Sequence, residues 1–503
     1  MSSDSLVVMS PVTGERVATV PNMDTAAIGD MARRARAAQP AWARLGFAGR
    51  ARVLRPLARW LLDHSDDVFR VVCSETGKQY EDVLLELGGV VSALQFWSRH
   101  AKRYLAEQKY RSASPFVLGK KLRISYVPRG VAGVIAPWNF PLALGFGDSI
   151  PALMAGNSVI LKPSEITPLS IEVIARGLIE CGLPNNVFQI ATGSAETGEA
   201  LIDEADVIMF TGSTATGKKV LARAAETLTP VTTELGGKDA MIVLADADLE
   251  RSANLAVYGS MLNGGQVCMS IERAYVHEDI YDEFVRCVVD KVDKLRVGPP
   301  AGFGRADIGA ISSPAQMDVI ERQVRNSEAM GAQILVGGQR KPGWGNYFEP
   351  TVLTEVNHDM ECMRAETFGP ILPIMKVASA DEAVKLANDS YYGLSAVVCT
   401  RDTRAGGKIA DRIEAGTVLV NDIFSHSFAF GLPMGGVKGS GTGARNGKAG
   451  IRKYCELRVT VTSRWHLKRD LHMFPYEGRR SAVLMRMIRL LYGRGQPLGH
   501  RRP

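Results

Sequence analysis

The chain has 503 residues, of which 46% are hydrophobic and 22% are charged. This composition excludes a disordered chain, a collagen-like fibre and a small protein held together by disulfides. The length predicts about two to four domains, each able to bury its own core.

The net charge of +7 is localised rather than spread over the chain. Residues 465–503 carry nine Lys or Arg and two Asp or Glu, so the rest of the sequence is neutral. A basic face across the body of the protein is therefore excluded, and we expect no nucleic-acid partner.

The seven cysteines form no CxxC pair, and their number is odd. This pattern argues against a disulfide framework and against a structural zinc site. The first fifteen residues contain neither the basic segment nor the apolar core of a signal peptide. The sequence thus predicts a cytoplasmic protein without a metal site.

Helices are predicted over residues 24–110, where apolar residues recur every three or four positions. Residues 120–131 alternate like a strand, and strands then alternate with helices. The predicted strands are 133–137, 158–162, 187–191, 207–210 and 241–244, and the predicted helices include 171–181 and 217–227. This order predicts a doubly wound parallel sheet.

A second α/β alternation runs from residue 274 to residue 420. Its predicted strands are 274–276, 334–338, 371–377, 395–400 and 417–421, and its predicted helices are 279–295, 381–388 and 403–415. A last alternating segment, 458–462, is predicted to pair with 120–131, in a sheet that could join two subunits.

Residues 212–219 match the P-loop pattern GxxxxGK, except that Lys219 replaces the Ser or Thr that would hold magnesium. We therefore disfavour a nucleoside triphosphatase. Because the segment follows a strand and opens a helix, its free N–H groups could instead face a phosphate. The fingerprint GxGxxG does not occur in the sequence.

Three further residues have patterns that suit catalysis. Cys268 follows a glycine pair and an amide in NGGQVC, which suits an exposed thiolate with a lowered pKa; a small buried side chain is the alternative. Glu234 precedes two glycines and could act as a general base, or could be a surface residue beside a turn. Asn139 lies between prolines, where its amide could stabilise an oxyanion or cap the next helix.

Lys162 and Glu165 follow a predicted strand, in the sequence KPSE. An acidic residue at the carboxyl end of a strand typically binds a sugar diol. A solvated charged loop is the alternative.

Together these segments resemble the aldehyde dehydrogenase superfamily over about residues 8–465, in its order and spacing. The matching segments are APWNFP (136–141), KPSE (162–165), FTGSTATG (210–217), TELGGK (233–238), NGGQVCMS (263–270), ETFGP (366–370) and PMGGVKGSG (433–441). The resemblance extends to an actinobacterial group described as succinate-semialdehyde dehydrogenase-like.

The resemblance implies an α/β fold with three parts. A Rossmann-type cofactor domain would comprise residues 1–119 and 132–233, and an α/β catalytic domain residues 234–435. A small oligomerisation sheet would comprise residues 120–131 and 436–464, followed by a basic tail, 465–503. A homodimer or homotetramer is implied.

The resemblance also implies residue roles. Cys268 would attack the aldehyde to give a thiohemiacetal, with the oxyanion held by the Asn139 amide and the Cys268 N–H. After hydride transfer, Glu234 would activate the water that hydrolyses the thioester. The implied cofactor site comprises Lys162 and Glu165 at the adenosine ribose, Gly212 and Ser213 at the diphosphate, and Glu366 and Phe368 at the nicotinamide riboside, together with Ile135, Trp138, Ser164, Gly217 and Leu235.

Two residues refine this expectation. Glu234 favours release of a free acid, since relatives that transfer the acyl group to coenzyme A usually lack it. Glu165 favours NAD, because a carboxylate repels the 2′-phosphate of NADP. NADP remains the alternative.

The substrate is predicted from absent charges. Succinate-semialdehyde dehydrogenases typically carry arginines where this chain has Gly147 and Leu262. Of the aromatic positions of acetaldehyde-type relatives, Phe140 is kept while Gly147 and Met434 differ. We therefore favour a medium-chain or aromatic aldehyde. Succinate semialdehyde, bound through Arg445 or another arginine, is the alternative, as is a non-catalytic binding protein, against which the three catalytic residues argue.

The tail contains a predicted amphipathic helix, 479–492. Arg479, Arg486 and Arg489 would lie near one face, and Val483, Met487, Leu490 and Leu491 opposite. We favour docking on a neighbouring subunit or on the protein's own core. A peripheral contact with an acidic membrane is the alternative.

Overall fold

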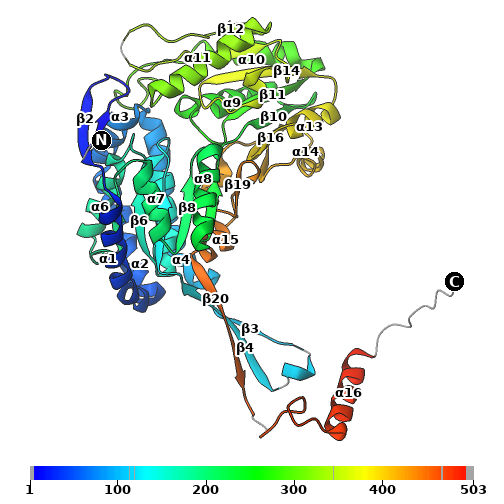
Figure 1. The fold of residues 1–503 in the computed structure, drawn as a ribbon. Coiled ribbons are helices and arrows are strands. Elements are labelled where there is room, and N and C mark those ends of the chain that lie inside the picture. The colour runs from blue at the N-terminus through cyan, green and yellow to red at the C-terminus, as the bar shows by residue number, and fades with distance from the viewer. Residues whose placement is uncertain (1–4, 113, 118, 344, 466–467, 494–503) are drawn as a thin grey trace, which may run out of the picture. The chain divides into compact units, whose positions relative to one another are not determined.

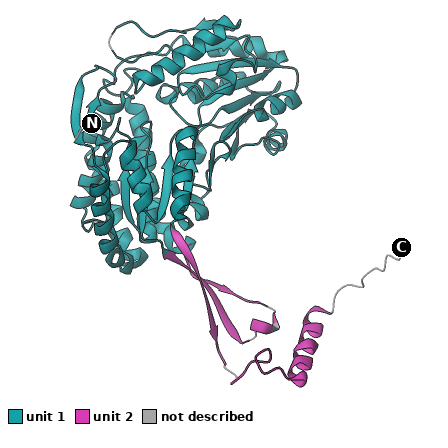
Figure 2. Ribbon diagram, viewed as in Figure 1, with its two compact units in different colours: residues 1–104, 128–454 teal, residues 105–127, 455–503 magenta. Residues whose placement is uncertain are grey.

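The structure is a computed structural model that describes residues 5–112, 114–117, 119–343, 345–465 and 468–493. The chain forms two compact units (Figure 2). Unit 1 comprises residues 1–104 and 128–454, and unit 2 comprises residues 105–127 and 455–503.

Unit 1 begins with a hairpin and a group of helices (Figure 1). The elements are β1 (Ser5–Met9), β2 (Arg16–Pro21), α1 (Thr25–Arg44), α2 (Gly46–Asp63), α3 (Ser65–Thr76) and α4 (Tyr80–Tyr104). The predicted helical region is confirmed as far as residue 104, and the hairpin is an element that the sequence analysis did not predict. Asp24 caps α1 by accepting a hydrogen bond from the N–H of Ala27, at 2.8 Å.

The first sheet of unit 1 has six strands in the order β19-β9-β8-β5-β6-β7, and all but β19 are parallel. The strands are β5 (Val131–Ile135), β6 (Ser158–Lys162), β7 (Phe188–Ile190), β8 (Val207–Thr211), β9 (Val231–Glu234) and β19 (Gly441–Thr442). The connecting helices are η2 (Pro141–Phe146), α5 (Gly147–Ala155), α6 (Leu169–Glu180), α7 (Ala195–Glu204) and α8 (Thr214–Thr227). Every residue of β6 and β8 is buried, as is typical of parallel strands covered on both faces.

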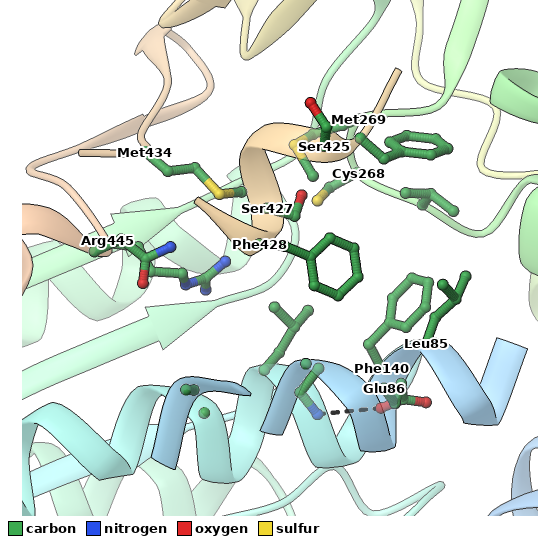
Figure 3. Close-up of a pocket in the computed structure, with 18 of the residues that line it drawn as sticks. Leu85, Glu86, Phe140, Cys268, Met269, Ser425, Ser427, Phe428, Met434 and Arg445 are labelled. Carbon is green, nitrogen blue, oxygen red and sulfur yellow. Dashed lines mark hydrogen bonds between the residues drawn. The ribbon is translucent and has the colours of Figure 1, made fainter. Parts of the chain in front are cut away.

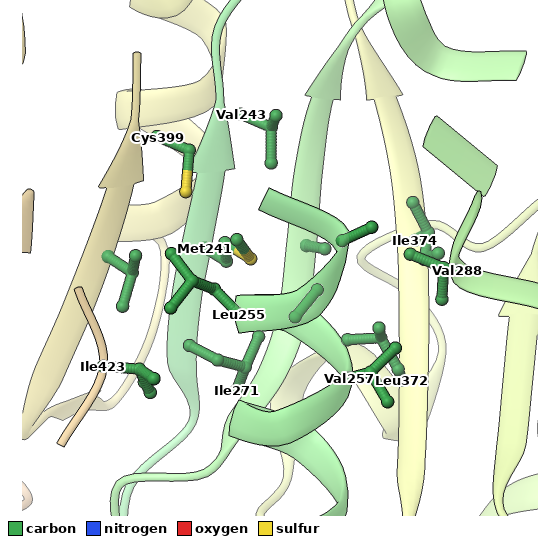
Figure 4. Packing of buried hydrophobic residues seen from close by; sticks show 14 of the residues in the cluster. Met241, Val243, Leu255, Val257, Ile271, Val288, Leu372, Ile374, Cys399 and Ile423 are labelled. Atoms are coloured by element: carbon green, nitrogen blue, oxygen red, sulfur yellow. The ribbon is translucent and has the colours of Figure 1, made fainter. Parts of the chain in front are cut away.

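The second sheet has seven strands in the order β12-β13-β14-β11-β10-β16-β17, and only β12 is antiparallel to its neighbour. The strands are β10 (Asp239–Val243), β11 (Ile271–His277), β12 (Gln333–Val336), β13 (Thr351–Thr354), β14 (Ile371–Val377), β16 (Ser395–Cys399) and β17 (Thr417–Val420). The longer helices are α9 (Leu249–Met261), α10 (Tyr281–Val292), α11 (Pro314–Ala329), α13 (Ala380–Asn388) and α14 (Thr403–Ala410). Figure 4 shows the apolar core between α9 and this sheet, which includes Met241, Leu255 and Ile271. The two predicted α/β alternations are confirmed.

Short elements complete unit 1. They are η3 (Leu262–Gly265), η4 (Glu278–Ile280), α12 (Glu361–Arg364), β15 (Tyr392–Gly393), η5 (Ser425–Phe428), β18 (Val437–Lys438) and α15 (Gly447–Arg452). Residues 436–454, which the sequence analysis placed largely in the oligomerisation sheet, belong to unit 1, where β19 pairs with β9 and β18 pairs with β15.

The carboxyl ends of strands in the first sheet and the amino ends of strands in the second sheet lie near the same site. The segments that follow β5, β6, β8 and β9 contain the predicted motifs of the first sheet. Cys268 and Glu366 come shortly before β11 and β14, at the amino ends of strands in the second sheet. Loops from both sheets therefore build the site described below.

Unit 2 contains a three-stranded sheet in the order β20-β4-β3, and the helix α16 (Gly478–Tyr492). The other elements are β3 (Gln108–Tyr110), η1 (Pro115–Val117), β4 (Lys120–Pro128) and β20 (Cys455–Ser463). The predicted pairing of the two distant segments is confirmed, as is the helix near the C-terminus. The predicted strand 120–131 divides into β4 and β5 at Gly130, whose φ of 136° favours glycine and whose added Cβ would lie 2.3 Å from an Asp206 oxygen.

Candidate active site

Cys268 lies where two cavities of unit 1 meet. One cavity, of about 260 Å³, is largely apolar, and Figure 3 shows the Cys268 thiol and the Phe428 ring beside it. The other, of about 200 Å³, is lined by Asn139 and Glu234 as well as Cys268. The three predicted catalytic residues are therefore brought to one place, although they lie on separate loops.

The Cys268 loop needs its glycines. Gly264 and Gly265 have φ values of 65° and 73°, in the left-handed region. A Cβ on Gly265 would lie 2.0 Å from the carbonyl oxygen of Gly369, and one on Gly237 would lie 2.4 Å from that of Cys268. The glycines thus permit close backbone packing around the thiol.

The environment of the thiol differs from the expected one. Cys268 is half-buried, and burial raises the pKa of its thiol to about 12, while the charge of Arg445 acts in the opposite direction. The prediction of an exposed thiol with a lowered pKa is wrong for this structure, because the sequence could not show how closely the loop is packed. The thiol has to give its proton to a base before it can attack.

Both the side chain and the main-chain carbonyl of Asn139 form hydrogen bonds. Its Nδ2 donates to the carbonyl of Gln266 at 2.9 Å, so the side chain lies against the Cys268 loop. Its carbonyl accepts hydrogen bonds from Lys78 Nζ at 2.7 Å and Asn263 Nδ2 at 3.1 Å. Since an amide nitrogen has two N–H groups, one bond to Gln266 leaves the second for a ligand oxygen.

The sequence analysis missed Lys78 and Glu86, which form hydrogen bonds with the backbone of Asn139 and of the turn that follows it. Lys78 Nζ lies 2.5 Å from Glu86 Oε1, and both side chains are buried. Glu86 Oε2 accepts the N–H groups of Leu142 and Ala143, at 2.9 and 3.2 Å, and so fixes the turn after Asn139. Within a helical region these two residues gave no signal, because their partner lies more than fifty residues away in the sequence.

Glu234 ends β9 and is 3% exposed. In the described part of the chain its Oε1 has no hydrogen-bond partner. Burial raises the pKa of this carboxyl to about 7, opposed by the charges of Arg445 and Lys453 and reinforced by that of Asp148. A carboxyl that titrates near neutral pH suits a general base.

The second cavity fits part of a dinucleotide. Of the predicted cofactor residues, those that line it are Trp138, Gly212, Ser213, Leu235, Glu366 and Phe368. Glu366 Oε1 accepts the N–H of Gly237 at 3.0 Å, and a Cβ on Gly236 would lie 2.4 Å from Glu366 Oε2. Ser213 caps α8, whose N-terminus offers a positive dipole end to a phosphate.

The remaining predicted cofactor residues lie outside this cavity. They are Ile135, Lys162, Ser164, Glu165 and Gly217. The first four are at the carboxyl ends of β5 and β6, where Lys162 Nζ and Glu165 form an ion pair at 3.2 Å. Gly217 lies in α8, and its added Cβ would meet Leu235 at 2.5 Å, so it allows that helix to approach β9.

The apolar cavity contains the positions from which the substrate was predicted, namely Phe140, Gly147, Leu262 and Met434. Its remaining apolar lining comes from α4, η2, α9, the Cys268 loop and the region of η5: Leu85, Val90, Ala93, Ala143, Leu144, Tyr258, Val267, Met269, Ile423, Phe424, Phe428 and Phe430. Among the described residues that line it, Arg445 is the one cation, and its Nε and Nη2 bond Asp148 at 2.8 and 2.9 Å. This pairing was also not predicted.

Residues 1–460 match the model of the aldehyde dehydrogenase family. The chain belongs to this family. It is 38% identical over 457 residues to a Mycobacterium ulcerans protein provisionally named succinate-semialdehyde dehydrogenase [NADP(+)] 2, with 90% of this chain and 87% of the relative covered. It is 36% identical to a 4,4'-diapolycopene aldehyde oxidase of Methylomonas sp, over 97% of this chain and 92% of the relative.

A solved structure is similar as well. The betaine aldehyde dehydrogenase of Staphylococcus aureus, in complex with NAD+, has a TM-score of 0.87 and 30% identity, covering 92% of each chain. The predicted fold class and enzyme class are thereby confirmed. The expected nicotinamide cofactor agrees with the NADP(+) and NAD+ in the names of these relatives.

Proposed function

We propose that this enzyme oxidises an apolar, medium-chain or aromatic aldehyde to the free acid, with Cys268 as the nucleophile. The observation that carries the proposal is the position of Cys268 between an apolar cavity and a cavity that fits a nicotinamide. An aldehyde in the first cavity and a cofactor in the second would both reach the sulfur.

The residues of this chain would act in order. Cys268 Sγ gives its proton to the Glu234 carboxylate, which lines the same cavity, and bonds the carbonyl carbon, while Asn139 Nδ2 and the Cys268 N–H hold the oxygen that becomes negative. A nicotinamide held in the second cavity would supply the hydride acceptor. Glu234, having released its proton to solvent, removes a proton from water, which attacks the thioester; the C–S bond breaks, the acid leaves, and the Cys268 thiolate takes back a proton from Glu234.

The lining of the apolar cavity favours the substrate class. Gly147 and Leu262 contribute no charge, and Arg445 is bonded to Asp148. A second carboxylate would be buried there without a free cation. Removing one such ion from water costs on the order of several kcal/mol. The alternative is succinate semialdehyde, which the name of the Mycobacterium ulcerans relative supports.

An aldehyde panel tests this proposal. Hexanal, benzaldehyde and succinate semialdehyde are each offered with NAD and with NADP, and formation of the reduced cofactor is followed by absorbance. We expect hexanal or benzaldehyde to have the highest kcat/KM. A preference for succinate semialdehyde would replace the proposal with its alternative.

We infer that NAD is preferred over NADP. The Glu165 side chain is about half exposed beside Lys162, where it would accept hydrogen bonds from a ribose diol and repel a 2′-phosphate. The alternative is supported by the NADP(+) in the name of the relative. Glu165→Gln is expected to raise kcat/KM with NADP relative to NAD, and an unchanged ratio would contradict the inference.

We infer that unit 2 forms homodimers or homotetramers through its sheet. β20 exposes the alternate side chains Leu457, Val459 and Val461, of which Val459 is 66% exposed. A row of exposed apolar side chains on a strand marks an interaction surface. Val459→Lys should reduce the mass measured by analytical ultracentrifugation, and a wild-type monomer would contradict the inference.

We infer that α16 docks on a neighbouring subunit or on the protein's own core; a peripheral contact with an acidic membrane surface, which would suit an apolar substrate, is the alternative. Among the described residues no helix is both long and apolar enough to span a bilayer. No residue of α16 is buried, and Leu490 is 63% exposed on a helix that carries four arginines. Exposed apolar and cationic side chains on one helix suit anionic lipid headgroups.

Co-sedimentation with vesicles tests this contact. The full chain and a chain ending at residue 465 are mixed with vesicles containing phosphatidylserine or phosphatidylcholine alone. We expect the two chains to behave alike with both kinds of vesicle, and a smaller subunit number on truncation would indicate docking on a neighbouring subunit. Sedimentation of the full chain alone, and only with the anionic vesicles, would favour the membrane contact instead. All seven cysteines are free, which fits a cytoplasmic location.

A further inference from the structure

A buried ion pair lies next to the site, and the reaction scheme above does not use it. Arg445 is 8% exposed and Asp148 is 3% exposed. The Nε and Nη2 of Arg445 donate to the two Asp148 oxygens at 2.8 and 2.9 Å, and Nη2 also donates to Thr211 Oγ1 at 2.7 Å. These three bonds hold the guanidinium in one orientation.

The surrounding backbone brings this guanidinium close to Glu234. Thr211, its hydrogen-bond partner, is paired with Glu234 in the register of β8 and β9. Arg445 also exchanges backbone hydrogen bonds with Met434, at 2.8 and 2.6 Å. The next residue, Gly435, is so close to the base that its added Cβ would lie 3.2 Å from Glu234 Oε1.

The same guanidinium faces the nucleophile. Arg445 and Cys268 line the same apolar cavity, and Figure 3 shows both side chains there. The charge of Arg445 lowers the pKa of the Cys268 thiol against the effect of burial. One cation thus acts on both groups that exchange protons in the proposed reaction.

Five titratable or charged groups act on Glu234 or share its cavity. They are Cys268 on its loop, Glu366 before β14, Asp148 in α5, Arg445 before α15 and Lys453 after α15. The Nζ of Lys453 lies 2.9 Å from Met209 Sδ and 3.4 Å from the carbonyl oxygen of Ala444. Glu234 Oε1 has no hydrogen-bond partner among the described residues, so burial, which raises the pKa of this carboxyl, is opposed by nearby positive charges and not by hydrogen bonds to this oxygen.

We propose that Arg445 is a positioning residue that keeps Glu234 a carboxylate and favours the Cys268 thiolate, and that the negative charge of Asp148 opposes this effect. This proposal rests on the proposed function only in the roles of Cys268 and Glu234. It assigns opposite effects to the two members of one ion pair. Loss of Arg445 removes a positive charge near Glu234, whereas loss of the Asp148 charge removes a negative one.

Two readouts without cofactor test the proposal. The rate at which iodoacetamide alkylates Cys268 reports the thiolate, and the pH dependence of p-nitrophenyl acetate hydrolysis reports the base. In Arg445→Gln, we expect the alkylation midpoint and the acid limb of hydrolysis to move to higher pH by about 1. In Asp148→Asn, we expect the acid limb to move to lower pH.

Control variants separate charge from damage to the fold. Glu234→Gln should remove the acid limb, and Arg445→Lys should restore part of the shift. Arg59→Gln has the same charge change on the exposed surface of α2 and should leave both profiles unchanged. The double variant Asp148→Asn/Arg445→Gln leaves neither charge unpaired, and its acid limb should lie between those of the single variants.

Shifts in the same direction for Arg445→Gln and Asp148→Asn would overturn the proposal, as would a loss of rate without any shift. Where one single variant does not fold, an acid limb of the double variant that is shifted further from the wild type than that of the folded single variant, in the same direction, overturns it. Failure of the proposed function is distinguishable, because it would appear as aldehyde oxidation that persists in Cys268→Ala, whatever these profiles show.

Discussion

The two cavities that meet at Cys268 differ in polarity and in how the chain builds them. The cavity on the Glu234 side is formed by short loops after β5, β8 and β9 and before β14. The apolar cavity is formed by side chains of α4, η2, α9 and the region around η5. The proposed nucleophile is common to the two sides, whereas our proposal assigns the selection of the substrate to the apolar side alone.

Removal of the shared residue is the strongest test of this comparison. Cys268→Ala should reduce aldehyde oxidation at least about 1000-fold, since no other group can form the acyl intermediate. Cofactor reduction with hexanal is the measurement. Cys181→Ala, at the end of α6, is the matched control and should retain full activity. Comparable loss in both variants would contradict the assignment.

The buried ion pair between Lys78 and Glu86, beside the apolar cavity, should be important for stability. Glu86→Gln leaves Lys78 buried without its ionic partner, and should lower the free energy of unfolding by about 3–5 kcal/mol. Urea denaturation measures the difference. Glu199→Gln, in an exposed pair with Arg223, should cost about 0.2–1 kcal/mol. Equal losses in the free energy of unfolding would show that the buried pair contributes no more to stability than the exposed pair.

The side-chain amide of Asn139 should affect turnover. Asn139→Ala should lower kcat about 100- to 1000-fold, because it removes one oxyanion donor. Steady-state kinetics with hexanal measures the change, and Asn254→Ala on the exposed face of α9 is the control. A raised KM with an unchanged kcat would show that Asn139 only binds substrate.

The pH dependence separates the base from the nucleophile. The pKa of Glu234 is raised to about 7, and only its carboxylate can accept a proton from water. Thioester hydrolysis should therefore be constant above pH 7 and fall about tenfold for each pH unit below it. Decay of a pre-formed acyl-enzyme measures this rate. A flat profile in the wild type would rule out Glu234 as the base.

A charge placed in the apolar side should change selectivity. Leu262→Arg should raise kcat/KM for succinate semialdehyde relative to hexanal by about tenfold, since a charge-assisted hydrogen bond contributes about 1.5 kcal/mol or more. Parallel assays with both aldehydes give the ratio. Leu62→Arg, at an exposed position of α2, should leave it unchanged. An unchanged ratio in Leu262→Arg would mean that this wall does not contact the substrate.

Much of the polar side could be predicted from the sequence. Many of its residues occupy short segments directly after or before buried strands, where glycines such as Gly236 permit close approach, so local sequence carries the information. Asn139, Glu234 and Cys268 were singled out in this way, and the structure brings the three to one cavity, while their catalytic roles stay predictions.

The supporting contacts could not be predicted in the same way. Lys78, just before α4, bonds Asn139, and Glu86 in α4 bonds the turn after it, both from far away in the sequence. Arg445 meets Asp148 across nearly three hundred residues. The raised pKa of the Cys268 thiol has the same origin, because burial is a property of the packed structure. Long-range pairing is what the structure adds.

The central claim is that Cys268 carries the acyl group of an apolar aldehyde, and mass spectrometry of a trapped intermediate tests it most directly. Glu234→Gln is incubated with NAD and hexanal, then digested at acidic pH. We expect a hexanoyl adduct on the peptide that contains Cys268, and little adduct with succinate semialdehyde. An adduct on another cysteine, or none while the cofactor is reduced, would contradict the account.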